Sequence, residues 1–167
     1  MTFTPHTLET APAASVPAMQ QVAKKFGAVP RAVALQAESP ALLTGFLAGS
    51  AAVERTSLPP LAREVVILTV AARNGCGICL RIHGATLASL GGSAHLEALT
   101  NRTALSDPAL EEARLFTERL LGTSGDLPDP AVRSFLAAGF TREHALDIVF
   151  TVGIYTMSTL ANRLVGA

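Results

Sequence analysis

The stretch Glu64–His83, EVVILTVAARNGCGICLRIH, decides the fold expected of this chain. It belongs to an apolar run, Leu61 to Arg73, whose pattern is that of a deeply buried helix. The run ends at Asn74-Gly75, two residues that tolerate left-handed backbone angles and therefore terminate helices. The residues after this break predict a second helix, from about Cys76 to Leu90. Two consecutive helices joined by a tight turn are thus expected at the centre of the chain.

Helical patterning continues on both sides of this stretch. Apolar residues recur at helical spacing between capping residues or prolines that begin helices and glycines that end them. No segment alternates apolar with polar residues as a half-buried strand would. Residues 1–16 show no periodicity and predict an extended N-terminal arm. We therefore expect an all-α fold, with one helical domain of about seven or eight helices at residues 17–167.

The composition argues against some classes of binding partner and for others. Lys plus Arg equals Asp plus Glu, and this zero net charge argues against nucleic acid as a partner. Only 16% of the residues are charged, so either some helices are buried on all sides or other copies of the chain cover part of the surface. We favour a homo-oligomer. The apolar run 148–161 is too short to span a bilayer and no secretory signal is visible, so we expect a cytoplasmic protein without a membrane partner.

Three reactive side chains share one face of the second helix. Cys76, Cys79 and His83 stand at positions i, i+3 and i+7, within two turns of one another. Cys76 falls at the helix start, where unpaired N–H groups and the positive end of the helix dipole favour a thiolate. His83 can exchange a proton with either sulfur. A buried carboxylate is costly unless it is paired, so Glu64 is expected to face this cluster.

The same residues also have simpler interpretations. The cysteines could be two small buried hydrophobic residues, or half of a zinc site. Structural zinc usually takes four protein ligands, and His95 follows His83 by twelve residues, which is not a zinc-finger spacing. Glu64 could pair with a neighbouring arginine. We expect no metal and no cofactor, because nucleotide-binding and haem-attachment motifs are missing. Ordinary surface or core roles are expected for His6, His95, His144, Thr151 and Tyr155.

The spacing of the four reactive residues resembles a known family. A glutamate, eleven residues, Cys-x-x-Cys, three residues and a histidine form the motif of the alkylhydroperoxidase D-like proteins of the carboxymuconolactone decarboxylase family. In this chain the motif is formed by Glu64, Cys76, Cys79 and His83. The resemblance is strong over about residues 20–100 and weaker towards the C-terminus.

The resemblance implies both an assembly and an activity. The subunit would be all-helical and would assemble as a trimer or a hexamer. It would reduce hydroperoxides: Cys79 would be oxidised to a sulfenic acid, and Cys76 would donate a proton and then close a disulfide. Glu64 and His83 would relay protons, and a dithiol reductant, such as a lipoyl-bearing adaptor, would restore the thiols. The position at the helix start instead favours Cys76 as the attacking thiol, and the assignment to Cys79 follows the family.

Three functions fit these residues. The first, which we predict, is a thiol-dependent peroxidase. The second is a non-enzymatic redox sensor or disulfide-exchange protein, whose assembly would change with the state of the cysteines. The third is a decarboxylase-like lyase that uses His83 as a general base; that branch of the family typically lacks the cysteine pair. One departure concerns Gly77-Ile78, where family members often carry an aromatic residue or a histidine that could carry protons.

Overall fold

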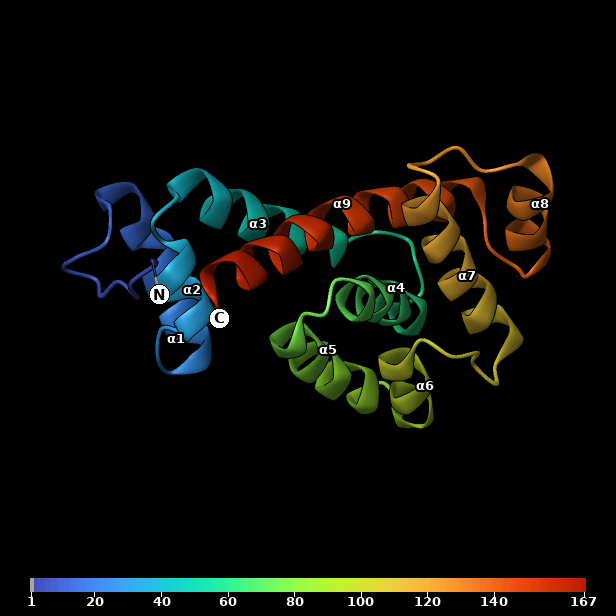
Figure 1. Ribbon diagram of the computed structural model, residues 1–167, viewed down its shortest axis with the longest axis horizontal. Coiled ribbons are helices and arrows are strands. Elements are labelled where there is room, and N and C mark those ends of the chain that lie inside the picture. The colour runs from blue at the N-terminus through green and yellow to red at the C-terminus, as the bar shows by residue number, and fades with distance from the viewer. Residues whose placement is uncertain (1) are drawn as a thin grey trace.

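The computed structural model describes residues 2–167, and within this range the chain folds into nine α-helices and two short 3₁₀ turns without any strand (Figure 1). The all-α fold predicted from the sequence is confirmed. The nine helices of this range are close to the expected seven or eight, and the short α2 and α6 have six residues each. The elements are η1 (Ala13–Ser15), α1 (Val16–Phe26), α2 (Arg31–Gln36), α3 (Pro40–Val53), α4 (Pro60–Arg73), α5 (Gly77–Ser89), η2 (Ser93–His95), α6 (Leu96–Asn101), α7 (Pro108–Gly122), α8 (Asp129–Ala137) and α9 (Arg142–Val165).

Helix α4 is the centre of the fold. Every residue from Ala62 to Ala71 is buried, including the charged Arg63 and Glu64. Helices α5, α6, α7 and α9 all pack against α4, so that it has neighbours on several sides (Figure 1). The buried helix predicted from the apolar run is therefore present, and it carries Glu64 into the interior.

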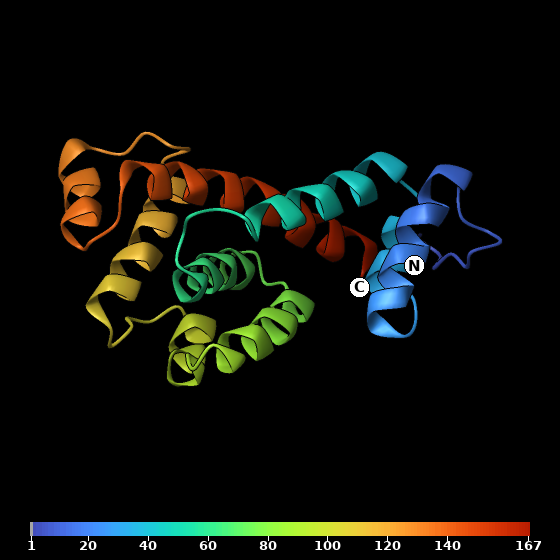
Figure 2. The ribbon, with the colours of Figure 1, turned by 180° about the vertical axis from the view of Figure 1, so that it is seen from behind.

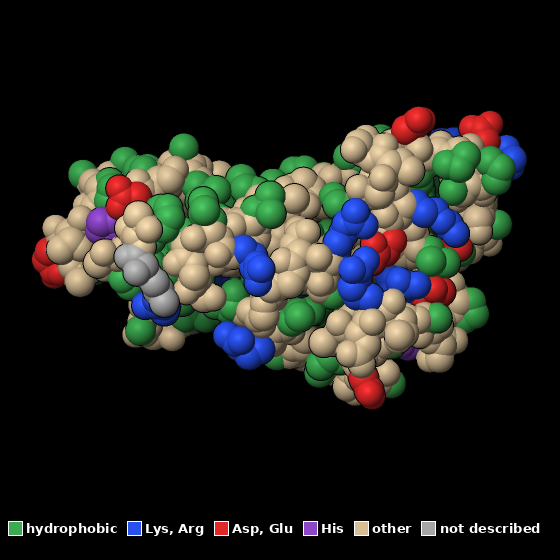
Figure 3. Space-filling view, viewed as in Figure 1, with side chains coloured by type: hydrophobic (Ala, Val, Ile, Leu, Met, Phe, Trp, Pro, Cys, Tyr) green, Lys and Arg blue, Asp and Glu red, His purple; other side chains and the backbone are tan. Residues whose placement is uncertain are grey.

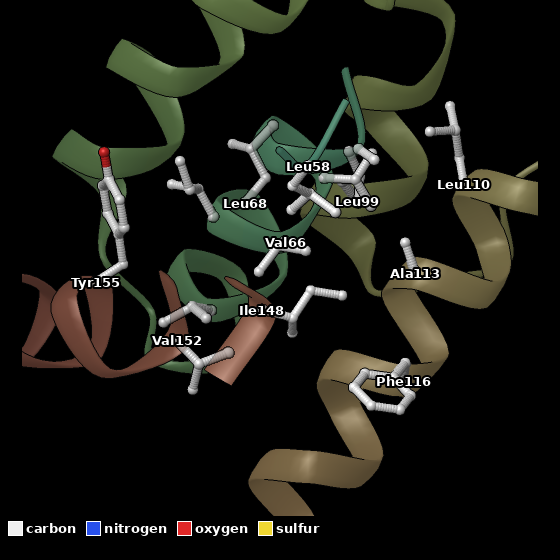
Figure 4. Close-up of a cluster of buried hydrophobic side chains, with 14 of the residues drawn as sticks. Leu58, Val66, Leu68, Leu99, Leu110, Ala113, Phe116, Ile148, Val152 and Tyr155 are labelled. Atoms are coloured by element: carbon white, nitrogen blue, oxygen red, sulfur yellow. The ribbon is translucent and has the colours of Figure 1, made fainter. Parts of the chain in front are cut away.

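The main core lies where α4 meets α7 and α9. Leucine, valine and isoleucine side chains from these helices converge there, together with the ring of Tyr155 (Figure 4). Three phenylalanines extend the core towards α8: Phe135 stacks on Phe116 and on Phe140, with ring centroids 4.2 and 4.5 Å apart. Close packing of this kind fixes the relative positions of α4 and α9, which both contribute to the candidate site.

The turn between α4 and α5 places the cysteines. Gly75 adopts a positive φ of 63°, the left-handed conformation that glycine adopts without strain. The N–H of Cys76 then donates to the carbonyl oxygen of Ala71 at 2.9 Å, and Cys76 becomes the N-cap of α5. The Asn74 amide donates to Thr159 Oγ1 at 2.8 Å and thereby attaches the turn to α9. Both cysteines consequently lie at the start of α5.

The N-terminal segment and the C-terminal end of α9 meet at one end of an elongated molecule (Figures 1 and 2). Helices α1 and α2 lie there, while α8 lies at the opposite end, and α3 and α9 run between them. His6 attaches the segment before α1 to the turn that follows α2: its Nε2 lies 2.8 Å from Glu38 Oε2. The division into an arm at residues 1–16 and a domain at 17–167 stays a prediction, and Met1 lies outside the described residues.

Helix α9 extends beyond both ends of the apolar run 148–161 that was considered as a membrane span. By length and composition it is the one helix in the described part of the chain that could cross a membrane. Of its most apolar window, 44% is buried inside the domain, against helices that include α3 and α4. Its other side exposes an apolar stripe, here called the α9 stripe, formed by Leu146, Val149, Phe150, Leu160 and Leu164.

Candidate functional site

Glu64 and His83, predicted to act together, are in direct contact. Glu64 Oε2 of α4 lies 2.8 Å from His83 Nδ1 of α5. The Glu64 side chain is 1% exposed and the His83 side chain 17%. Because an ionised carboxylate only accepts hydrogen bonds, the proton of this bond belongs to Nδ1. The other ring nitrogen, Nε2, is then the atom through which His83 can exchange protons.

Tyr155 of α9 completes the surroundings of His83. Its ring meets the imidazole edge to face, with centroids 4.9 Å apart, and its hydroxyl lies 3.3 Å from Ser50 Oγ. Burial raises the pKa of Tyr155 to about 12, and the nearby Glu64 carboxylate adds to the shift, so the phenol stays neutral. The sequence suggested core packing for Tyr155. It is indeed buried, but it also fixes the orientation of the His83 ring.

The two cysteines also touch. Their sulfur atoms lie 2.6 Å apart as free thiols, and both residues are buried, together with Ala71, at the junction of α4 and α5. A disulfide bond measures about 2.05 Å, so a small side-chain movement would bring the sulfurs to bonding distance. The i, i+3 spacing predicted from the sequence thus produces a dithiol poised for disulfide formation.

The two thiols differ in their pKa values. The hydrogen bond with Cys79 lowers the pKa of Cys76 to about 6, assisted by the Asn162 amide and the charge of Arg163, and opposed by burial. The same hydrogen bond, burial and the charge on Cys76 raise the pKa of Cys79 well above its ordinary value. Cys76 is therefore the more acidic thiol, in agreement with its position at the helix start. Contact between the two sulfurs thus shifts their pKa values in opposite directions.

Two buried amides beside the cysteines were not predicted as site residues. Asn162 Nδ2 lies 3.4 Å from Cys79 Sγ and 3.8 Å from Cys76 Sγ. Gln36 Nε2 donates in turn to Asn162 Oδ1 at 2.7 Å. The sequence offered one signal for Asn162, a polar residue on the otherwise buried face of α9. It offered none for Gln36, which reaches the site only through the fold.

Two arginines close to Glu64 in the sequence have other partners. Glu64 does not pair with a neighbouring arginine: Arg63 pairs with Glu54 at 2.9 Å, and Arg73 with Glu118 at 3.0 Å. In residues 2–167 no three His, Cys, Asp or Glu side chains gather as a metal site. His144 caps α9 by accepting from the N–H of Thr141, so it has a structural role.

Two surface grooves lie outside the reactive cluster. One, of about 600 Å³, lies between the N-terminal segment, α2 and the end of α9, and Phe3, Leu42, Leu160 and Leu164 are among its lining residues. Gln36 also lines it. The other, of about 380 Å³, lies between α5 and α6. Neither is lined by the cysteines or by His83, so the reactive sulfurs do not lie on the floor of either groove.

A family model matches the centre of the chain. Residues 37–119 match the model of the carboxymuconolactone decarboxylase family. This segment includes Glu64, both cysteines and His83, and it leaves out the two amides, Gln36 and Asn162. No curated protein matches the chain.

Two crystal structures share its fold over nearly the whole length. One is an alkylhydroperoxidase AhpD core, an uncharacterized peroxidase-related protein from Ralstonia eutropha JMP134: the TM-score is 0.84 at 21% identity, covering 98% of this chain and 89% of the other. The second is an uncharacterized peroxidase-related protein from Silicibacter sp. TM1040, with a TM-score of 0.77 at 22% identity, covering 93% and 84%. At these identities the likeness establishes the fold.

Proposed function

Because the chain belongs to the carboxymuconolactone decarboxylase family and has an alkylhydroperoxidase-like fold, we propose that it is a thiol-dependent peroxidase. The main support is the contact between the Cys76 and Cys79 sulfurs, 2.6 Å apart, on the same helix as the His83 that pairs with Glu64. A dithiol and a proton carrier are the two parts that hydroperoxide reduction requires. The peroxidase-related proteins of the same fold add support.

The first step forms a sulfenic acid on Cys79. The Cys79 proton passes to the Cys76 thiolate, whose sulfur already shares a hydrogen bond with it. The Cys79 sulfur attacks the terminal oxygen of the hydroperoxide, the O–O bond breaks, and an alkoxide leaves. Cys76 returns the proton to the alkoxide, which departs as an alcohol. Cys79 is thereby oxidised by two electrons, and the peroxide is reduced.

The second step forms the disulfide. The Cys76 thiolate attacks the Cys79 sulfur and displaces hydroxide, which leaves as water after accepting a proton from the Glu64–His83 pair. A dithiol reductant, which could be a lipoyl group on an adaptor protein, then reduces the disulfide by thiol exchange. Such a cycle suits a reducing compartment such as the cytoplasm.

One equivalent of cumene hydroperoxide added to reduced protein is expected to remove two hydrogens from the chain. Intact-mass spectrometry should show this loss within seconds, and peptide mapping should locate a Cys76–Cys79 disulfide. Peroxide consumption should then continue when dithiothreitol is present. Two untouched thiols would contradict the proposal, and a disulfide that forms without catalytic turnover would favour the redox sensor instead.

The surface supports a homo-oligomer, which we propose as the working form. The accessible area of 8484 Å² exceeds the roughly 7,800 Å² expected of a compact 17.3 kDa monomer. Leu160 and Leu164 of the α9 stripe are 56% and 72% exposed, and hydrophobic side chains recur over the surface near α3 and α9 (Figure 3). Large exposed apolar surfaces usually mark an interface. The family resemblance implies a trimer or a hexamer.

Light scattering after gel filtration is expected to give the mass of several chains for the wild type. The double variant Leu160→Glu/Leu164→Glu should shift this mass to that of one chain, because it places two carboxylates in the α9 stripe. Phe26→Glu, which alters an equally exposed residue outside the stripe, should keep the wild-type mass. A wild type that elutes as a monomer would refute the proposed assembly, and the proposed peroxidase chemistry would be unaffected.

A further inference from the structure

We propose that Asn162, oriented by Gln36, is the hydrogen-bond donor that stabilises negative charge on the cysteine pair. Asn162 would be a catalytic residue because it touches the reacting sulfurs, and Gln36 would be a positioning residue. Only the use of this charge in peroxide reduction rests on the proposed function. The acidity of the thiols can be measured without any peroxide.

The Asn162 amide is the polar side chain that α9 presents to the sulfurs. Its Nδ2 lies 3.4 Å from Cys79 Sγ and 3.8 Å from Cys76 Sγ, within hydrogen-bonding reach of the large sulfur atoms. Asn162 is 7% exposed, and both cysteines are buried. In such a poorly hydrated position a hydrogen bond to a charged atom is stronger than in water. One amide can therefore serve whichever of the two sulfurs carries the charge.

Gln36 determines which end of the Asn162 amide faces the sulfurs. Gln36 Nε2 donates to Asn162 Oδ1 at 2.7 Å, and this bond turns the NH₂ group of Asn162 towards the cysteines. Turning the Asn162 amide alone would bring two NH₂ groups together. Turning both amides would direct Oδ1 at the thiols, where it would stabilise the neutral S–H instead. The direction of the thiol pKa change on removing Asn162 therefore tests the orientation.

The cost of burying these amides also points to a role. Gln36 is 5% exposed, and an apolar residue at either position would fill the space without any polar group to satisfy. The two residues are 126 positions apart, so the pair also joins α2 to α9. Purely structural amides would bond to each other and to the backbone, whereas Asn162 directs its free hydrogens at the reactive sulfurs.

Two other charged side chains must be considered beside the cysteine pair, Arg163 and Glu64. Arg163 follows Asn162 on α9, donates to the carbonyl oxygen of Gly75 at 3.3 Å, and lowers the pKa of Cys76 by its charge. The Glu64 carboxylate of α4 is held by His83 of α5. The effect of Asn162 must be separated from these groups, and a variant that leaves them in place does so.

The test is the rate of alkylation of the reduced, full-length protein by iodoacetamide as a function of pH, with each modified cysteine located by peptide mass spectrometry. Asn162→Ala is expected to raise the pKa of the more acidic thiol by about 1, which lowers the thiolate fraction about tenfold below that pH. Gln36→Met should shift this pKa in the same direction by less. Asn162→Asp should raise it most, because a carboxylate then faces the sulfurs.

Ser57→Ala is the matched control. It also removes a side-chain hydrogen bond to α9, to Asp147 Oδ2 at 2.9 Å, fifteen residues before Asn162 on that helix, and should leave the thiol pKa near the wild-type value. An unchanged or lowered pKa in both Asn162→Ala and Gln36→Met would overturn the inference. Gln36→Met alone decides if Asn162→Ala does not fold. If the pKa rises while the wild type lacks peroxidase turnover, the proposed function fails and the role of Asn162 stands.

Discussion

Replacing Cys79 with serine is expected to lower hydroperoxide turnover by at least about 10³-fold. The serine hydroxyl does not ionise near neutral pH, so the variant lacks a nucleophile at the position that attacks the O–O bond. The measurement is the consumption of cumene hydroperoxide with dithiothreitol as reductant. Far-UV circular dichroism should be unchanged, because serine is close to cysteine in size.

Cys76→Ser is the control that separates the two sulfurs. It should also halt steady turnover. Because it removes the thiolate that accepts the Cys79 proton, its Cys79 should be oxidised once but more slowly than in the wild type, and should then be trapped as a sulfenic acid by dimedone. The reverse pattern, with dimedone labelling Cys76 in the Cys79→Ser variant and none in Cys76→Ser, would show that Cys76 attacks. Its lower pKa makes that outcome the direct competitor of the family-based assignment.

The pH dependence of the first oxidation follows from the same pair. With a pKa of about 6, Cys76 is a thiol below that pH and cannot accept the Cys79 proton. The single-turnover rate should therefore rise with pH through about 6 and level off above it. The free energy of unfolding should rise with pH as well, from about 6 up to the ordinary cysteine value of 9.0, because the folded state holds this thiolate more readily than the unfolded chain.

The elements that local signals determine could be predicted from the sequence. Asn74-Gly75 was expected to end the buried helix, and the structure has the left-handed Gly75 at that point. A buried carboxylate needs a partner, which by itself left Glu64 to pair with an arginine or to face the Cys/His cluster. The four residues together favoured the cluster, and Glu64 Oε2 lies 2.8 Å from His83 Nδ1.

Contacts between distant segments could not be predicted in this way. The bond between Gln36 and Asn162 joins residues 126 positions apart and depends on how α2 packs beside α9. Tyr155 was expected to be core, and burial alone says nothing about the His83 ring that it meets. Gln36, Asn162 and Tyr155 belong to the site through tertiary packing, which single-sequence periodicity does not encode.

Glu64→Gln is expected to lower hydroperoxide turnover by about 10²-fold while leaving the fold intact. The amide has nearly the same shape as the carboxylate and can still accept from His83 Nδ1, so the free energy of unfolding in urea should change little. What is lost is the negative charge, 2.8 Å from the imidazole, that stabilises its protonated form between proton transfers. Peroxide consumption and urea unfolding, measured on the same preparation, separate the two effects.

Glu54→Gln supplies the matched control, because Glu54 pairs with Arg63 and does not touch His83. Its turnover should stay within about twofold of the wild type, as expected of a half-exposed ion pair. His83→Leu should behave differently from Glu64→Gln, since it leaves the Glu64 carboxylate buried and unpaired, at a cost of about 3 kcal/mol in unfolding free energy. Equal turnover in Glu64→Gln and Glu54→Gln would remove Glu64 from the proton relay. Together with a large loss of stability in His83→Leu, that result would make the pair a structural contact between α4 and α5.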